Sequence, residues 1–471
     1  MTRVFLRDLC AVASAALLVL TAVLVGRHIQ DAHRTLFVHW PPLFAEWDPH
    51  VGPGTPAALA VAVAVVAYGP SLAGRLSWRA MLLSAWAASL AWTWSLALVD
   101  GWQRGVAGRL TTTNEYLRVV DRFHDIPAAL SDFTRHIVWG TPDPWPAHIA
   151  GHPPAATVTF VLLDHLGLRG GGWAGAWCIT VGSTACVAVL LTVGLLAGRD
   201  LARRAAPFMV LAPAAVWVGT SADGYFAAVA AWSVALLALA VRGAPGAGGR
   251  AVAAFGAGLL FGLTCYLSYG LTLFALIGAA VLLLGAMPGV ARRAGLRGHG
   301  PAGIRPAVLL RGSAALLAGL AVVPLVFTLA GFDWWEGYRL LVTRYYQGVG
   351  GTRPYGYWVW ANLACTVFIA GFATAAGLGR AGAALVRDRA DLLHGRLSAA
   401  EARLAVLVFG ALLALLVADL SGMSKAETER IWVPFALWLL PSCALLTRPR
   451  AWLTAQALLA LLVNHLLLTG W

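Results

Sequence analysis

Acidic residues in one polar stretch are the first candidates for chemistry. Asp100, Glu115 and Asp121 lie in or at the start of the segment 100–153, the longest polar stretch of a chain whose 471 residues are 59% hydrophobic. A carboxylate held against a cavity can act as general base on a hydroxyl group. The alternative is a solvated helix face with Glu115 in its first turn, where the helix dipole favours a carboxylate.

Two histidines close the same stretch in the sequence "PAHIAGHPPAATVTF". His148 and His152 are four residues apart, a spacing that could place both on a metal, but Gly151 and the following Pro-Pro pair argue against one continuous helix. Binding of a phosphate or a sugar hydroxyl is the favoured interpretation. No metal-binding motif is present, the sequence requires no cofactor, and a divalent cation stays open.

A second group of charged residues follows in "SKAETERIW", residues 424–432. Arg430 precedes an apolar run, and the planar guanidinium matches phosphate oxygens bidentately. Lys425 is the only lysine of the chain. Both are predicted to bind a phosphate, with Glu427 or Glu429 orienting them. The alternative is a small external turn with internal ion pairs.

The segment 331–360 combines aromatic residues, glycine and arginine. Tyr346 and Trp358 are candidates for stacking on a sugar ring or prenyl chain, with Arg353 near a phosphate. Trp and Tyr also favour the membrane interface, which is the alternative.

Two further acidic sites compete with these. Asp223 in "GTSADGYF" is either functional or a helix N-cap. Glu46 and Asp48 in "WPPLFAEWDPH" form a rival acidic loop, or an interfacial turn anchored by its tryptophans.

The elements that position these residues follow from composition. The mean hydropathy is +0.74 and charged residues make up 12% of the chain, which excludes a soluble domain of this length. Apolar runs of about 20 residues fit membrane-spanning helices better than the weak alternation of a barrel. The predicted class is an all-α polytopic bundle. The net charge of +13 reflects arginines in short loops, which indicate topology rather than a nucleic-acid partner.

Apolar spans and basic loops predict the topology. Arg3 and Arg7 precede an uncleaved first helix, which places the amino terminus in the cytoplasm. The basic loops 292–311 and 379–396 are also placed there. Five crossings between 155 and 287, the first of them formed by 155–167, bring the total to about 13 membrane helices. The basic "GRDLARR" (198–204) then falls outside, against the positive-inside rule.

In this topology residues 1–471 form a single integral membrane domain. The loops 100–153, 332–356 and 421–430 all face the outer side. The extracytoplasmic loop 100–153 is predicted to bear amphipathic helices, the first in "TTTNEYLRVVDRF" with a Thr or Asn cap.

The sequences "NEY" and, about forty residues later, "HPP" resemble the motifs of C-type (GT-C) integral membrane glycosyltransferases, such as the protein O-mannosyltransferases and the lipid A aminoarabinose transferase. The matching positions are Asn114, Glu115, Tyr116, His152, Pro153 and Pro154. The chain departs from the family by having Asn114 where the catalytic Asp usually stands. Glu115 is therefore preferred as the base, then Asp100, then Asp121.

The resemblance implies transfer of a sugar, mannose or arabinose-like, from a polyprenyl-phosphate donor to a hydroxyl of a cell-envelope glycan, lipid or protein at the outer face of the plasma membrane. The predicted donor phosphate-binding residues are Arg430, Lys425, His152 and Arg353. The predicted substrate-binding residues are His148, Tyr116, Tyr346, Trp358 and Glu429. The competing functions are a flippase or transporter of lipid-linked sugars and an inactive relative, the latter supported by Asn114 alone.

Overall fold

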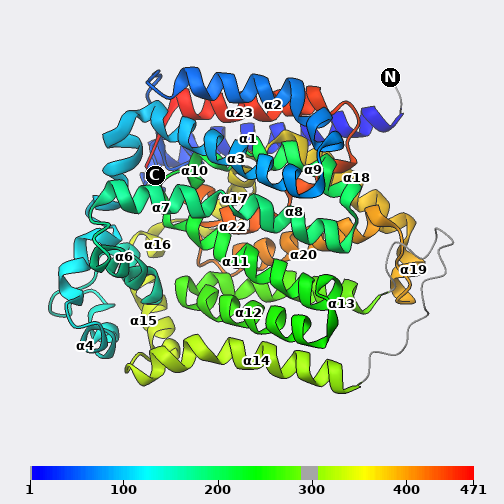
Figure 1. Cartoon of the computed structure of the whole chain (residues 1–471). Helices are drawn as coiled ribbons and strands as arrows, with labels where there is room; N and C mark the ends of the chain where they lie inside the picture. Colours follow the sequence, from blue (N-terminus) through cyan, green and yellow to red (C-terminus); the bar gives the residue numbers. More distant parts are fainter. Residues whose placement is uncertain (1–2, 288–305, 471) are drawn as a thin grey trace.

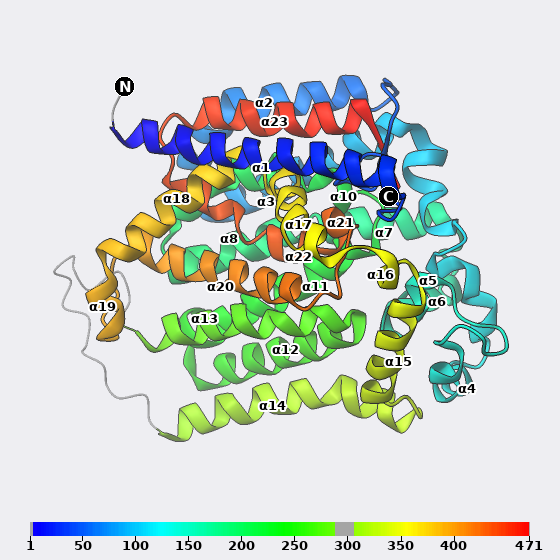
Figure 2. The same cartoon turned by 180° about the vertical axis from the view of Figure 1, so that it is seen from behind.

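The computed structural model describes residues 3–287 and 306–470, and long helices dominate it (Figures 1 and 2). Within the described residues, nine helical stretches are long and apolar enough to cross a membrane: Phe5–His33, Thr55–Arg75, Trp78–Asp100, Gly171–Leu196, Ala222–Gly243, Gly246–Leu267, Tyr269–Ala286, Leu310–Leu329 and Ala400–Leu420. Backbone N–H and C=O groups hydrogen-bond to one another within a helix, which is necessary in the hydrocarbon core of a membrane because no water is available there. The prediction of an all-α polytopic bundle is confirmed.

The elements that carry these spans are α1 (Arg3–His33), α2 (Thr55–Arg75), α3 (Trp78–Ala97), α7 (Gly171–Gly182), α8 (Ala185–Leu196), α11 (Ala222–Ala238), α12 (Gly246–Leu267), α13 (Phe274–Ala286), α14 (Pro306–Leu329) and α20 (Ala400–Leu420). Four of these spans contain local irregularities. A 3₁₀ turn, Leu98–Asp100, follows α3, and a π-helical turn, Leu239–Gly243, follows α11. Residues Ser183–Thr184 separate α7 from α8, and a short 3₁₀ helix, Tyr269–Leu273, leads into α13.

In the described ranges 3–287 and 306–470 the number of spans is nine, or ten with one bent pair, against about 13 predicted. Besides 155–167, three predicted crossings are missing from this number, because each joins the two ends of the bundle but is too short or too polar for the same criterion. They are α9 (Arg199–Val210) with α10 (Ala215–Val218), the helical run Val433–Leu445, which includes α22 (Val433–Ala436), and α23 (Pro449–Leu466). The last predicted crossing before residue 287 forms two spans, Gly246–Leu267 and Tyr269–Ala286.

The bent pair consists of α17 (Tyr355–Ala370) and α18 (Phe372–Arg387), which meet at 104°. Gly371 lies between them with φ +84°, a conformation that side-chain-bearing residues rarely adopt. A Cβ at this position would lie 1.6 Å from Oε1 of Gln456. The same Gln456 donates its side-chain N–H to the carbonyl of Ala370, at 3.0 Å, so the bend is held by a neighbouring helix.

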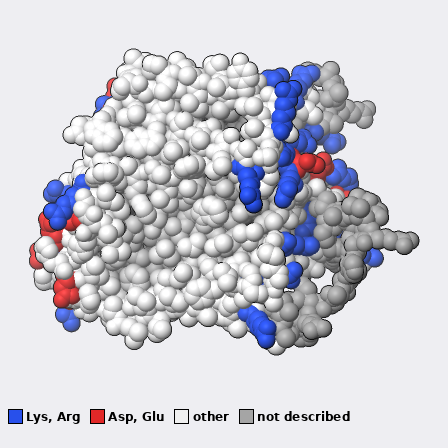
Figure 3. Space-filling model, in the orientation of Figure 1, with Lys and Arg blue, Asp and Glu red and all other residues white. Residues whose placement is uncertain are grey.

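At one end of the bundle, arginine side chains donate hydrogen bonds to the carbonyl groups at the C-termini of several helices. Arg203 donates to the carbonyl of Leu76 at 2.8 Å, and Arg403, almost fully buried, donates to the carbonyls of Leu196 and Leu284. These carbonyls belong to helix C-termini, which have no intrahelical partners. Figure 3 shows Lys and Arg concentrated at this end, a white belt without charged residues, and mixed charges at the opposite end.

The placement of "GRDLARR" outside is wrong. Its Arg203 contacts the loop after α2, which the prediction itself put on the cytoplasmic side. The error comes from 155–167, which was counted as a crossing. The helix there, α6 (Ala155–His165), is only 11 residues long and lies beside the polar loop at the other end (Figure 1). Of the predicted basic loop 292–311, residues 292–305 lie outside the described residues.

The three predicted outer loops meet at the mixed-charge end. Arg344 on α15 (Trp334–Gln347) donates to the carbonyl of Trp145, at 3.1 Å. Arg353, just after α16 (Val349–Thr352), donates to the carbonyl of Lys425, at 2.8 Å. A two-stranded antiparallel sheet of β1 (Ala45–Trp47) and β2 (Leu467–Thr469) lies here as well.

The loop 100–153 is built from short helices. They include η4 (Tyr116–Phe123), α4 (Ile126–Ser131) and α5 (Ala147–Ala150). The predicted amphipathic helix is the 3₁₀ helix η4, which buries Tyr116, Val119 and Phe123. The expected Thr or Asn cap is wrong: Glu115 precedes the helix, without a capping side-chain hydrogen bond. As predicted, α5 ends before Gly151, so no continuous helix joins the two histidines.

Candidate active site

Glu115 and His148 form the core of the site. Glu115 directly precedes η4, and its side chain is 7% exposed. Its Oε1 lies 3.0 Å from Nδ1 of His148 on α5. The backbone N–H of His148 donates to the carbonyl of Asn114, at 3.2 Å, so the two segments are also joined through the main chain. A polar partner at this distance offsets part of the cost of burying a carboxylate.

Arg430 connects this pair to two other carboxylates. Its Nη1 donates to Oδ2 of Asp223 at 2.7 Å, its Nη2 lies 3.4 Å from Nε2 of His148, and Glu427 is 3.8 Å away. Burial by itself lowers the pKa of Arg430, but the carboxylates of Asp223, Glu427 and Glu115 outweigh it and the pKa is raised. A charged guanidinium, 5% exposed, is therefore held near the Glu115 carboxylate.

Asp223 is not the N-cap of α11 (Ala222–Ala238), which was the alternative interpretation of this residue. Ser221 caps α11, accepting from the N–H of Asp223 at 3.1 Å. The carboxylate of Asp223, in the first turn of α11, is left to pair with Arg430. Asp223 is therefore part of the site.

One small cavity joins these groups. It is lined by Arg109, Glu115, Thr220, Ser221, Ala222, Arg430 and Gly470. Two guanidinium groups, two hydroxyls and the N-terminal end of α11 surround one carboxylate. Arginines and a helix N-terminus favour an anion, and the carboxylate can accept a proton from a hydroxyl.

Asp100 holds one of the two arginines. Its carboxylate lies 3.0 Å from Nη2 of Arg109, 2.7 Å from Nε2 of His50 and 3.6 Å from Arg104. Arg104 also contacts Asp48, at 3.3 Å, so the rival acidic loop belongs to the same cluster. Asp100 is absent from the residues that line the cavity. The structure thus places Asp100 behind Arg109, whereas Glu115 faces the cavity.

Asp121 does not join the site. It is exposed on η4, on the face opposite the buried Tyr116, Val119 and Phe123.

Tyr116 and His152 pack behind Glu115. Tyr116 is fully buried and stacks on Phe160, with ring centroids 5.2 Å apart. Nδ1 of His152 donates to the carbonyl of His148, at 2.7 Å. Burial lowers the pKa of His152 to about 4, so its imidazole is neutral at neutral pH. Because Nδ1 carries the hydrogen of the neutral ring, Nε2 of His152 can only accept a hydrogen bond, and the ring brings no charge to a phosphate.

Lys425 and Arg353 form a separate group at the same end. Nζ of Lys425 donates to the carbonyl of Gly350, at 2.8 Å. Arg353 donates to the carbonyls of Leu36 and Lys425 and contacts Glu427 at 3.2 Å. Neither cation lines the cavity. Glu427 contacts both Arg353 and Arg430, and it adopts a left-handed conformation with φ +61°.

The remaining predicted substrate-binding residues lie apart from the cavity. Trp358 is fully buried against Tyr357, whereas Tyr346 is 51% exposed. Glu429 is fully buried, accepts from the N–H of Phe44 at 2.8 Å, and burial raises its pKa to about 7. The structure therefore gathers Glu115, His148 and Arg430 from the predicted set, and leaves Trp358, Tyr346 and Glu429 elsewhere.

Sequence reasoning missed Arg109, Thr220 and Ser221. Arg109 precedes Glu115 by six residues inside the polar loop, which was the available signal. Thr220 and Ser221 directly precede Asp223, so attention to that residue could have found them. Within the described residues, no group of three or more His, Cys, Asp or Glu side chains is placed to hold a metal ion.

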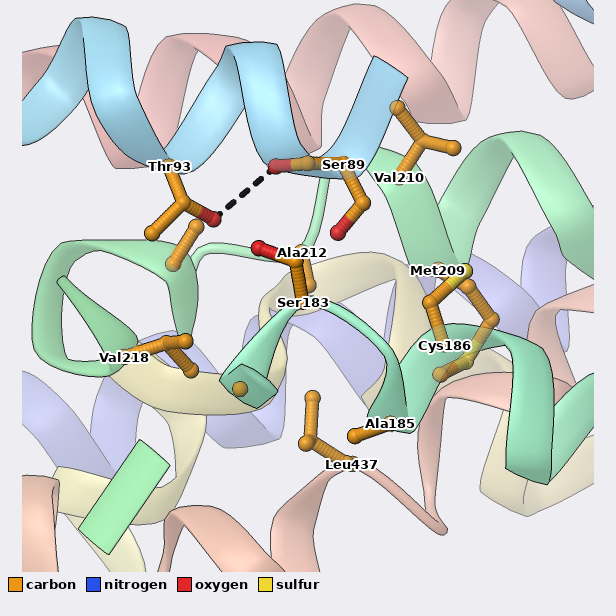
Figure 4. A pocket seen from close by; sticks show the side chains of 12 residues that line it. Ser89, Thr93, Ser183, Ala185, Cys186, Met209, Val210, Ala212, Val218 and Leu437 are labelled. Atoms are coloured by element: carbon orange, nitrogen blue, oxygen red, sulfur yellow. Dashed lines mark hydrogen bonds between the residues drawn. The ribbon is translucent and has the colours of Figure 1, made fainter. Parts of the chain in front are cut away.

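A second cavity of about 310 Å³ lies between α3, α8, α9 and Leu437 (Figure 4). Ser89, Thr93 and Ser183 contribute hydroxyls, and Oγ1 of Thr93 donates to the carbonyl of Ser89 at 2.9 Å. None of its lining residues is acidic or basic. A charged phosphate would lack compensation there, so the cavity at Glu115 is the better candidate.

Comparison with known proteins gives weak likeness. No protein-family model and no curated protein matches the chain. Three similar solved structures are of the Archaeoglobus fulgidus oligosaccharyltransferase. The first is tethered to an acceptor peptide; its TM-score is 0.41 and its identity 12%, over 78% of this chain and 49% of that chain. The second, AglB in complex with an inhibitory peptide and a dolichol-phosphate, has a TM-score of 0.42 and 12% identity, over 78% of this chain and 50% of that chain. The third, a complex with Zn and sulfate, has a TM-score of 0.40 and 14% identity, over 81% of this chain and 51% of that chain.

The chain spans about half the length of these neighbours. Likeness at this level leaves the function to be argued from the residues of this chain.

Proposed function

We propose that the chain is a GT-C-type membrane glycosyltransferase that moves a sugar from a polyprenyl-phosphate donor to an acceptor hydroxyl. The observation that carries this proposal is the cavity in which the buried Glu115 carboxylate faces Arg109 and Arg430. A base and paired cations are what glycosyl transfer from a phosphate requires. The "NEY" and "HPP" sequences, which resemble GT-C motifs, lend further support.

In the proposed reaction, Glu115 accepts the proton of the acceptor hydroxyl as the oxygen attacks the anomeric carbon. The bond between that carbon and the phosphate oxygen breaks, and its electron pair stays on the phosphate. Arg430 and Arg109 stabilise the additional negative charge through charge-assisted hydrogen bonds. Attack on the face opposite the leaving phosphate inverts the anomeric configuration.

Other residues take supporting roles in this proposal. Asp100 fixes Arg109, to which it is paired at 3.0 Å, instead of acting as the base. Lys425 and Arg353 bind the donor only at the rim of the site, since both are engaged with backbone carbonyls. The sugar is a mannose- or arabinose-like residue, and the acceptor is a cell-envelope glycan, lipid or protein.

The proposed location is the plasma membrane, with the arginine-rich end and the amino terminus in the cytoplasm. The charge distribution in Figure 3 supports this orientation through the positive-inside rule. A cysteine at the exposed Thr113, in a cysteine-free background, should react with an impermeant maleimide from outside intact cells. A cysteine at the exposed His394 should react only after permeabilisation; the reverse pattern contradicts the orientation.

The activity is tested with purified protein in lipid nanodiscs and radiolabelled polyprenyl-phospho-mannose, then with the arabinose donor. Wild type should release and transfer the label, Glu115→Gln should not, and Asp121→Asn should match wild type because Asp121 is exposed. If the wild type transfers no sugar from either donor but moves lipid-linked sugar between the leaflets, the protein is a flippase and the proposed enzyme activity is refuted.

A further inference from the structure

We propose that His148 is a positioning residue: its Nδ1–H holds the carboxylate of Glu115 in place as proton acceptor, and Arg430 determines which ring nitrogen carries that hydrogen. The expected effect on kcat rests on the proposed function. The arrangement of His148, Glu115 and Arg430 does not, because it concerns only contacts within this chain.

The tautomer follows from the two neighbours of the imidazole. A guanidinium has N–H donors and no acceptor, so Nε2 of His148, 3.4 Å from Nη2 of Arg430, must be the unprotonated nitrogen. The hydrogen of a neutral ring is then on Nδ1, which faces Oε1 of Glu115 at 3.0 Å.

The ring is fixed by its surroundings as well as by these two contacts. The main-chain N–H of His148 is bound to Asn114, and its carbonyl accepts from His152. The ring of Tyr116 lies 6.3 Å from the imidazole, centroid to centroid. Asp223 fixes the far side of Arg430, at 2.7 Å, so the guanidinium cannot turn away easily.

Glu115, rather than His148, is the group that reaches the substrate. Glu115 lines the cavity together with Arg109 and Arg430, whereas His148 is absent from the lining residues. The role of His148 is therefore to orient the base through the 3.0 Å contact between its Nδ1 and Oε1 of Glu115.

Two substitutions separate the nitrogens. The side-chain amide nitrogen of Asn lies near the position of Nδ1 of His, and that of Gln near Nε2. His148→Asn keeps a donor for Glu115 and should retain kcat within about threefold of wild type. His148→Gln loses it and should lower kcat about a hundredfold with little change in KM, the order expected when a reacting group is misplaced.

The exposed His124 of the same loop supplies the control, as His124→Gln should behave as wild type. Equal kcat values for the Asn and Gln variants of His148, whether both normal or both abolished, would overturn the inference. Both variants must first elute as monodisperse protein with wild-type thermal stability. If only His148→Gln unfolds, His148→Ala takes its place. Added imidazole should then restore the activity that His148→Ala lacks without it.

A second readout does not need turnover. The infrared carboxylate stretch of Glu115, identified by its loss in Glu115→Gln, should shift in frequency in His148→Gln relative to wild type, and should stay unchanged in His148→Asn. Arg430, Arg109, Asp223 and Tyr116 face the same carboxyl group and are unchanged in these variants. No difference between the two variants would overturn the inference even if the wild type transfers no sugar, so the two proposals fail separately.

Discussion

The pair of Arg430 and Asp223 gives the sharpest prediction about stability. Both side chains are 5% exposed and their charged atoms are 2.7 Å apart. Removing one partner of a buried ion pair leaves an uncompensated charge and costs about 3–5 kcal/mol of unfolding free energy. We expect this loss in Arg430→Gln. In the double variant Arg430→Gln with Asp223→Asn the charge of Asp223 is removed together with its partner, while Glu427 keeps Arg353 and Glu115 keeps His148. The expected loss is then about 1 kcal/mol, that of an ordinary hydrogen bond.

The same variants separate stability from catalysis. Unfolding free energies come from SDS titration in mixed micelles, and turnover from the labelled-donor assay. Both variants lack a preorganised donor at the phosphate position, so kcat should fall about 10²–10³-fold in each. Recovery of stability without recovery of turnover is the expected combination. A double variant that regains activity, or a single variant as stable as wild type, would refute the reasoning.

Two further predictions concern other positions. Burial raises the pKa of Glu429 from 4.5 to about 7, so the folded state binds a proton more tightly than the unfolded state, and wild-type stability should fall as pH rises from about 4.5 through 7. Glu429→Gln should remove this decline in unfolding titrations at several pH values; an unchanged slope would contradict it. Gly371→Ala should destabilise the protein by about 1–3 kcal/mol, because φ is +84° and the new Cβ would meet Gln456, and a wild-type unfolding curve would contradict the assigned bend.

Periodicity and charge predicted most of the fold. Runs such as Ala400–Leu420 and Thr55–Arg75 are apolar, of membrane-spanning length and bounded by polar residues, so local sequence determines them. The segment Ala155–His165 misled the prediction because a short apolar helix packed at a bundle end has the composition of part of a crossing. Its length, 11 residues or about 16 Å, was the physical argument against a crossing.

The site was predicted less completely, since distance along the chain does not reveal which side chains meet. Glu115, His148 and Arg430 were each predicted as site residues, but only the tertiary structure shows that they contact one another. Trp358 carried the residue type expected for sugar stacking, yet it is buried in the helix packing. Arg109 was missed because arginines were interpreted as topology signals, and one arginine in a polar loop differs from the others only in its tertiary partners.

The central claim is that Glu115 is the proton acceptor of a sugar transfer from a lipid-linked phosphate. The most direct measurement is single-turnover transfer from radiolabelled polyprenyl-phospho-sugar in nanodiscs by wild type, Glu115→Gln and Asp121→Asn. We expect a loss of about 10²–10⁴-fold in the rate of the chemical step for Glu115→Gln and no change for Asp121→Asn. Transfer by Glu115→Gln at the wild-type rate would contradict the account.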